Sequence, residues 1–214
     1  DVLKTFDKTV EYLKQEGVEI DFVSVDYKLL QAIYPTYIVI SCSEATSNNA
    51  NLDGIKFGPR ASGNTYQEVM TNSRTQGFGE LIRRRFVIGG YSLEKENQNE
   101  LFVRAQRVRR LIVNAFNDIL EKYDAIILPA SPSVAPLIDN SSEEIKESVI
   151  ADNYLGFANF GGMPSLTLPM GFKDGLPFGV NLTTKPFSES KLFNLAHMIE
   201  KHIGLANIVA KEDK

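Results

Sequence analysis

Hydrophobic residues recur every three or four positions in several parts of the chain, which is the spacing of a helix with one buried face. In the opening segment, Leu3, Phe6, Val10 and Leu13 follow this spacing, and Gly17 comes after them. We therefore expect a first helix that ends at this glycine. The same spacing predicts further helices over 101–119 and over 192–203, the last of which should stop at Gly204. A helical pattern also covers 28–49, with a kink or restart at Pro35. Thr65 and Glu68 fit a capping box that should start a helix at 65, and another helix is expected from 80.

Shorter alternating runs of β-branched and aromatic residues predict strands between these helices, at 18–23, 124–128, 165–168 and 178–182. Glycine and proline surround the third run. Gly161 and Gly162 permit positive φ before it, while Pro164 and Pro169 restrict the backbone at its two ends. Turns are expected at 52–59 and 173–177, and an exposed acidic segment at 139–147. Helices that alternate with strands indicate an α/β fold, which we expect to form a single unit over residues 1–214.

Composition narrows the class of protein. The chain has 214 residues, 43% of them hydrophobic, which is enough for a sizeable core. A formal net charge of −4 provides no general positive field, so the charge balance does not indicate a nucleic acid or a membrane as partner. The single cysteine excludes an internal disulfide, and no apolar run has the length of a membrane span. We expect a protein of the cytoplasm or an organellar matrix. Because the chain starts at Asp1 on a helical pattern, we also expect it to be part of a larger protein.

Histidine and cysteine offer no metal site in this sequence. His197 and His202 are five positions apart on one predicted helix and point to different faces, whereas a helical metal site uses positions four apart. Cys42 lies between two serines without a histidine nearby in the sequence, so we expect a packed side chain rather than a nucleophile. The sequence also lacks a nucleophile elbow, a phosphate-binding glycine loop and a dinucleotide fingerprint.

Arg109 occupies a position that calls for a chemical explanation. At about 100° per residue it falls among the apolar positions of the helix predicted over 101–119, whereas Arg107 and Arg110 point away. A guanidinium buried there needs an anion, which is either an internal carboxylate or a substrate carboxylate held by two parallel hydrogen bonds. The residues alone leave both possibilities open. Asp152 also has two interpretations: the N-cap of a helix that runs towards Phe160, or an acceptor for a substrate ammonium group.

Blocks of sequence spread over nearly the whole chain follow the order of one known family. They are SEATSN at 43–48, DGIKFG at 53–58, SR at 73–74 with GFG at 77–79 and RR at 84–85, QRVR at 106–109, LPASP at 128–132, the segment 159–169, and GLPFG at 175–179 with KPF at 185–187. Together they resemble the amidase-signature family. The first blocks are similar in particular to the A subunits of glutamyl-tRNA(Gln)/aspartyl-tRNA(Asn) amidotransferase. The resemblance implies the amidase-signature fold, a mixed central sheet flanked by helices, with this chain as its C-terminal portion.

The resemblance also implies a function in protein biosynthesis. In that family the A subunit hydrolyses glutamine to ammonia, and a B subunit uses ATP and Mg²⁺ to activate Glu-tRNA(Gln) or Asp-tRNA(Asn) for amidation. A small C subunit braces this ligase complex, and the A subunit itself needs no cofactor. By the same resemblance, Arg109 holds the α-carboxylate of glutamine and Asp152 its α-ammonium group. Phe57 takes a substrate-contacting position where the family often has tyrosine.

The catalytic groups of the family, a serine nucleophile, a second serine in a cis peptide and a lysine, belong to an N-terminal half with a GGSSG-type run. That run is missing from these 214 residues. We therefore expect this chain to hold substrate without containing the catalytic residues, and to be inactive by itself. Two alternatives remain. The chain is a fragment of a free-standing amidase, for which Arg109 and Asp152 would be superfluous, or it is a non-catalytic amidase-like module that binds partner subunits.

Overall fold

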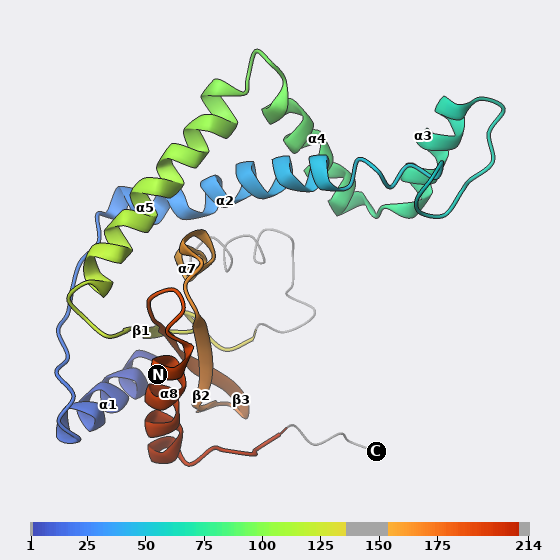
Figure 1. Cartoon of the computed structure of the whole chain (residues 1–214). Helices are drawn as coiled ribbons and strands as arrows, with labels where there is room; N and C mark the ends of the chain where they lie inside the picture. Colours follow the sequence, from blue (N-terminus) through green and yellow to red (C-terminus); the bar gives the residue numbers. More distant parts are fainter. Residues whose placement is uncertain (1, 136–153, 210–214) are drawn as a thin grey trace, which may run out of the picture. The chain divides into compact units, whose positions relative to one another are not determined.

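The computed structural model describes residues 2–135 and 154–209, and its contacts form two compact units, one comprising Asp1–Leu30 with Leu111–Lys214 and the other Gln31–Arg110. Compact units need not fold separately, so a single α/β unit over 1–214, half of a larger domain, stays a prediction. No helix in the described part of the chain is long and apolar enough to cross a membrane. The elements in chain order are α1 (Val2–Gln15), α2 (Tyr27–Asn48), α3 (Tyr66–Gly77), α4 (Glu80–Leu93), the π-helix η1 (Asn99–Val103), α5 (Arg104–Leu120), β1 (Ile126–Pro129), α7 (Gly156–Gly161), β2 (Ser165–Lys173), β3 (Leu176–Thr183) and α8 (Glu189–Ile203) (Figure 1).

The first unit is built on a three-stranded antiparallel sheet with β3 between β1 and β2. Side chains alternate across each strand, so Leu168 of β2 and Val180 and Leu182 of β3 share one face. Helices α1 and α8 pack on that face, α8 mainly against β2 (Figure 1). Each large side chain withdrawn from water there contributes roughly 1.5 to 3 kcal/mol. The helices supply Val2, Phe6, Val10, Leu13, Leu192, Ala196 and Ile199 to this core.

β2 and β3 form a hairpin with a two-residue turn. Its residues Asp174 and Gly175 have φ of 53° and 78°, the positive values that such turns require at both central positions. The predicted turn at 173–177 and the strand after it are therefore confirmed. β2 continues to Lys173, beyond the predicted end at 168, because a register irregularity between Pro169 and Gly171 accommodates the proline in a strand at the side of the sheet.

Gly162 ends α7 in the left-handed conformation, with φ 63° and ψ 33°. The next amide, that of Met163, donates to the carbonyl oxygen of Ala158 at 2.9 Å and closes the helix end. An L-residue with a side chain would be strained at this φ, which explains the glycine. The predicted positive φ is thus confirmed for Gly162, whereas Gly161 belongs to the helix.

Two predictions for the N-terminal part of the chain, a strand at 18–23 and the burial of Leu3, are wrong. Residues 18–26 have no regular secondary structure, although alternation had predicted a strand at 18–23. Among the described strands none pairs with this segment, and the side chains of Phe22 and Val23 are 78% and 48% exposed. The alternation reflects instead the packing of Val18 and Ile20 against the core. Leu3 was expected to face the core with the rest of α1, but it is 66% exposed.

In the second unit, α2 runs through Pro35 without interruption, and α2 and α4 approach each other closely. At Gly89 of α4, a Cβ atom would lie 2.1 Å from the carbonyl oxygen of Cys42. The hydroxyl of Thr46 lies within hydrogen-bonding distance of the carbonyl oxygens of Cys42 (2.8 Å) and Phe86 (3.3 Å). The two backbones therefore meet without a side chain between them.

The predicted capping box starts α3. Thr65 is the N-cap, and its hydroxyl accepts a hydrogen bond from the amide of Glu68 at 3.2 Å. The carboxylate of Glu68 reaches back and accepts from the amide of Asn64 at 2.7 Å, one residue earlier than a standard box. The bond to Thr65 satisfies one of the amide donors that a helix start leaves without a partner, so the cap prediction is confirmed.

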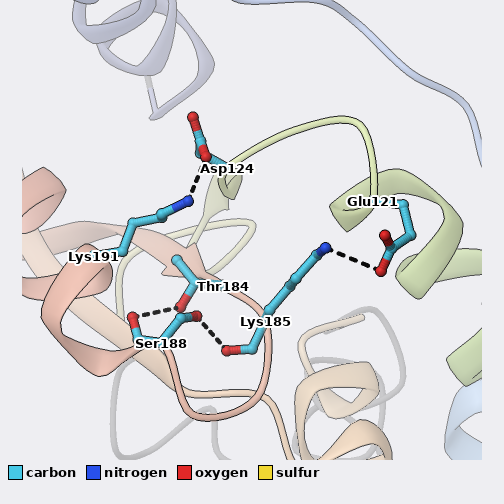
Figure 2. Close-up of polar contacts among 6 residues, drawn as sticks. All are labelled: Glu121, Asp124, Thr184, Lys185, Ser188 and Lys191. Carbon is cyan, nitrogen blue, oxygen red and sulfur yellow. Dashed lines mark hydrogen bonds and ion pairs between the residues drawn. The ribbon is translucent and has the colours of Figure 1, made fainter.

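The segment between β3 and α8, together with the first turn of α8, is linked by polar contacts to the connection between α5 and β1 (Figure 2). Lys185 pairs with Glu121 at 3.0 Å, and Lys191 pairs with Asp124. The hydroxyl of Ser188 closes the turn by donating to the carbonyl oxygen of Lys185. Because all four charged side chains are largely exposed, each pair contributes at most about 1 kcal/mol, and the contacts direct the chain more than they stabilise it.

Candidate functional site

Arg109 lies on α5 in the orientation that the helical spacing predicts. Its side chain is half-buried, whereas Arg107 and Arg110 are exposed. Its Nη1 donates to the Oε1 of Gln106, one turn earlier, at 3.2 Å. This hydrogen bond to an amide oxygen orients the planar guanidinium. A guanidinium held in this way is suited to a carboxylate, although its contact with a substrate stays a prediction.

Phe57 lies in a sharp turn of the loop over residues 49–62, and its side chain is 56% exposed. The amide of Gly54 donates to the carbonyl oxygen of Phe57 at 2.9 Å and closes the turn. Gly54 and Gly58 have φ of 76° and 81°, values that glycine adopts without strain. The turn predicted at 52–59 is confirmed. It presents an aromatic ring to solvent without the hydroxyl that a tyrosine would add.

Asp152 and the acidic segment 139–147 lie outside the described residues, so their predicted roles stay predictions. Arg109 and Phe57 belong to the same compact unit but to different elements, α5 and the loop over residues 49–62.

The cysteine and the histidines have structural surroundings. Cys42 is fully buried, and this burial raises the pKa of its thiol, although Arg85 and a hydrogen bond with Ser41 oppose the rise. A thiol kept protonated is a poor nucleophile, which agrees with the predicted packing role. The ring of His202 stacks on Tyr12 with centroids 3.4 Å apart. No group of three potential metal ligands occurs within residues 2–135 and 154–209.

Sequence reasoning missed a polar cluster on the sheet face opposite the core. The Nδ2 of Asn181 donates to the hydroxyls of Ser165 and Thr167, both at 3.0 Å, and Thr183 donates to the Oδ1 of Asn181 at 3.2 Å. Asn181 and Thr183 are buried. The alternation of hydroxyl residues with leucine over 165–168 was the available signal. The cluster contains no ionisable group, so it secures the pairing of β2 with β3 and offers no acid–base chemistry.

A pocket of about 280 Å³ lies at the end of β1, beside the LPASP block. Within it the hydroxyl of Ser131 donates to the carbonyl oxygen of Ser133 at 2.7 Å and is therefore engaged inside its own loop. The walls are mainly apolar, which suits an apolar group better than an ion. They are formed by Val2, Leu3, Leu128, Pro129, Ala130, Ser131, Pro132, Tyr154 and Leu155.

Comparison with known proteins places these features in a family. Residues 1–193 match the amidase family. The A subunit of glutamyl-tRNA(Gln) amidotransferase from Legionella pneumophila (strain Corby) is 37% identical over 188 residues, which are 87% of this chain and 39% of the relative. The corresponding protein from Fusobacterium nucleatum is 36% identical over 209 residues, 97% of this chain and 42% of the relative. The chain thus spans about two fifths of the length of these curated relatives.

Solved structures agree with the sequence relatives. The A subunit of glutamyl-tRNA(Gln) amidotransferase from Thermotoga maritima aligns with a TM-score of 0.62 and 27% identity, over 94% of this chain and 38% of that chain. A crystal structure of an amidase aligns with a TM-score of 0.70 and 21% identity, over 94% and 42%. This second match bears on the fold alone. The predicted amidase-signature fold, present in part, is confirmed, and the chain belongs to the amidase family.

Proposed function

We propose that this chain is part of the glutaminase (A) subunit of a tRNA-dependent amidotransferase, which converts Glu-tRNA(Gln) or Asp-tRNA(Asn) to the amidated form. The observation that carries the proposal is the agreement of the relatives. Curated proteins at 36–37% identity over 87–97% of this chain bear the name of that subunit.

The part of the reaction that we assign to this chain is the holding of glutamine. Arg109 binds the α-carboxylate, because a half-buried guanidinium oriented by Gln106 can hold a carboxylate with two parallel hydrogen bonds. Phe57 contributes apolar contact through its exposed ring, and Asp152 accepts from the α-ammonium group. A positive and a negative group at opposite ends of the α-carbon distinguish an amino acid from a simple amide.

The catalytic serines and the lysine come, in this proposal, from the part of the relatives' length that this chain does not span. Ammonia then passes to a B subunit, which uses ATP and Mg²⁺ to activate the misacylated tRNA, and a C subunit supports the assembly. This chain needs no cofactor of its own. Because the relatives are bacterial proteins, we place the complex in a bacterial cytoplasm or in an organelle of bacterial origin.

The test is an Arg109→Lys substitution in the intact amidotransferase. Lysine keeps the charge but not the planar pair of donors, so we expect a higher KM for glutamine and a loss of about 2 to 4 kcal/mol of transition-state stabilisation. Arg110→Lys is the matched control, because Arg110 is the next residue of the same helix and is exposed. Glutamine kinetics that are the same in both variants and the wild type would refute the clamp.

A second candidate is a free-standing amidase that acts on small amides. The observation in its favour is that residues 1–193 match the amidase family as a whole, and this match does not by itself single out the amidotransferase subunit. A substrate panel separates the two, since an enzyme built around Arg109 hydrolyses glutamine far faster than an amide that lacks the α-carboxylate. The remaining alternative, a non-catalytic module that binds partner subunits, predicts no amide hydrolysis in the intact protein.

A further inference from the structure

Three consecutive residues of α3 bind the loop over residues 49–62, which carries Phe57. The side-chain amide of Asn72 donates to the carbonyl oxygen of Ser62 at 2.8 Å. The hydroxyl of Ser73 accepts from the amide of Ala61 at 2.9 Å. The guanidinium of Arg74 donates hydrogen bonds to backbone carbonyl oxygens at the other end of the loop. One turn of helix therefore holds both ends of this loop.

Arg74 makes contacts that suit arginine and no other residue. Its Nη1 donates to the carbonyl oxygens of Asn49 at 2.8 Å and Leu52 at 3.0 Å, where α2 ends and the loop begins. Its guanidinium carbon also lies 5.1 Å from the ring centroids of both Phe78 and Phe86. A planar cation can stack on rings while its edge donates hydrogen bonds, whereas the compact ammonium group of lysine cannot do both in this geometry.

Ser73 contacts the turn at Gly54 in addition to binding the end of the loop at Ala61. A Cβ atom at Gly54 would lie 2.2 Å from the Oγ of Ser73, so the backbone of the turn rests directly on this hydroxyl. Gly54 in turn donates to the carbonyl oxygen of Phe57 at 2.9 Å. A path of direct contacts thus leads from Ser73 through Gly54 to Phe57.

We infer that Asn72, Ser73 and Arg74 are positioning residues for substrate binding: they hold the loop in the conformation that presents Phe57. This inference rests on the proposed function, in which Phe57 contacts glutamine. The side chain of Phe57 is 56% exposed and has little packing of its own to hold it, so the backbone contacts must fix its place. Binding to a loosened loop is weakened by the fraction of time that the loop spends in other conformations.

The first experiment measures glutamine hydrolysis by the intact complex with Ser73→Ala or Arg74→Lys. We expect KM to rise about threefold to tenfold with kcat changed less than twofold, because contacts that hold the ground state and the transition state equally alter KM alone. A general loss of folded enzyme would lower the apparent kcat and leave KM unchanged, so the two parameters separate positioning from stability. Thr75→Ala is the matched control, since Thr75 is the next residue of α3 and is exposed.

A double-mutant cycle asks whether the effect passes through Phe57. If it does, Arg74→Lys raises KM less in a Phe57→Ala background than in the wild type. Equal effects in both backgrounds would overturn the positioning role.

The second experiment does not depend on catalysis. The amide of Ala61 donates to Ser73, so its hydrogen exchange in the intact complex should accelerate about tenfold or more in Ser73→Ala and stay unchanged in Thr75→Ala. Unchanged exchange at Ala61 would overturn the inference. The proposed function would still stand if the complex hydrolyses glutamine. A wild-type complex that does not hydrolyse glutamine would refute the proposed function and the positioning role together. Faster exchange with an unchanged KM would overturn the positioning role alone.

Discussion

Gly89 and Gly90 are adjacent residues of α4 whose replacement by alanine is expected to change stability in opposite directions. Both substitutions improve helix propensity by about 0.8 to 1 kcal/mol. At Gly90 the new methyl group would have no neighbour within 4 Å, so Gly90→Ala should stabilise the protein by about that amount. At Gly89 the methyl group would lie 2.1 Å and 2.5 Å from the carbonyl oxygen and carbon of Cys42.

The size of the difference follows from these distances. An ordinary contact needs at least 3.4 Å, so α2 and α4 would have to separate by about 1 Å to admit the methyl group. Overpacking of this kind costs about 1 to 3 kcal/mol, and backbone atoms cannot turn aside as a side chain can. Because the propensity gain is common to both variants, their difference isolates this steric cost.

Thermal unfolding followed by circular dichroism measures the difference. A cost of about 1 to 3 kcal/mol corresponds to a Tm roughly 2 to 12 °C lower for Gly89→Ala than for Gly90→Ala. Equal Tm values in the two variants would mean that α2 and α4 are not in backbone contact at Gly89, and the described packing of this unit would be refuted.

Three further outcomes follow from local features. Gly162→Ala should lower the free energy of unfolding by about 1 kcal/mol in a urea titration because φ is positive there, whereas Gly77→Ala, at an open helical position, should not. Cys42 should react with iodoacetamide at least about tenfold faster after unfolding, because burial raises its pKa and blocks access; equal rates would contradict its burial. The hydrogen bond to Asp21 raises the pKa of Tyr123, since it favours the protonated phenol, so Asp21→Asn should lower that pKa in a titration of phenolate absorbance. Any stability linked to Tyr123 is present below the ordinary tyrosine pKa and lost as the pH rises above it.

Local signals in the sequence were enough to predict two helix ends and the hairpin turn. The capping box at Thr65, the left-handed glycine at Gly204 and the hairpin turn at 173–177 each depend on residues within one turn of each other. Their physical cause lies in the backbone of a few residues, so the rest of the chain can hardly override it.

Signals that depend on distant partners were less informative. Alternation at 18–23 resembled a strand, but a strand needs a neighbour to bond with, and the sequence does not say which segment that is. In the same way, the presence of Pro169 suggested that β2 would end, whereas an irregularity in its pairing with β3 lets it continue.

In the candidate site, too, local features could be predicted from the sequence and contacts between distant residues could not. Helical spacing was enough to predict that Arg109 is more buried than Arg107, because the helix period is a local property. The support that Arg74 gives to the loop of Phe57 could not be predicted, since its partners lie 22 and 25 residues away along the chain and are backbone carbonyls, which any sequence possesses.

The central place of β3 sets the order in which this sheet can assemble on the ribosome. β1 and β2 lie on opposite sides of β3 in the described sheet, so neither ladder can form before Leu176–Thr183 has been synthesised. β1 leaves the ribosome roughly fifty residues before β3, and until then its backbone has no strand of this sheet to pair with. A nascent chain arrested before Leu176 would therefore lack both ladders of the described sheet, and its unpaired β1 would be open to chaperones.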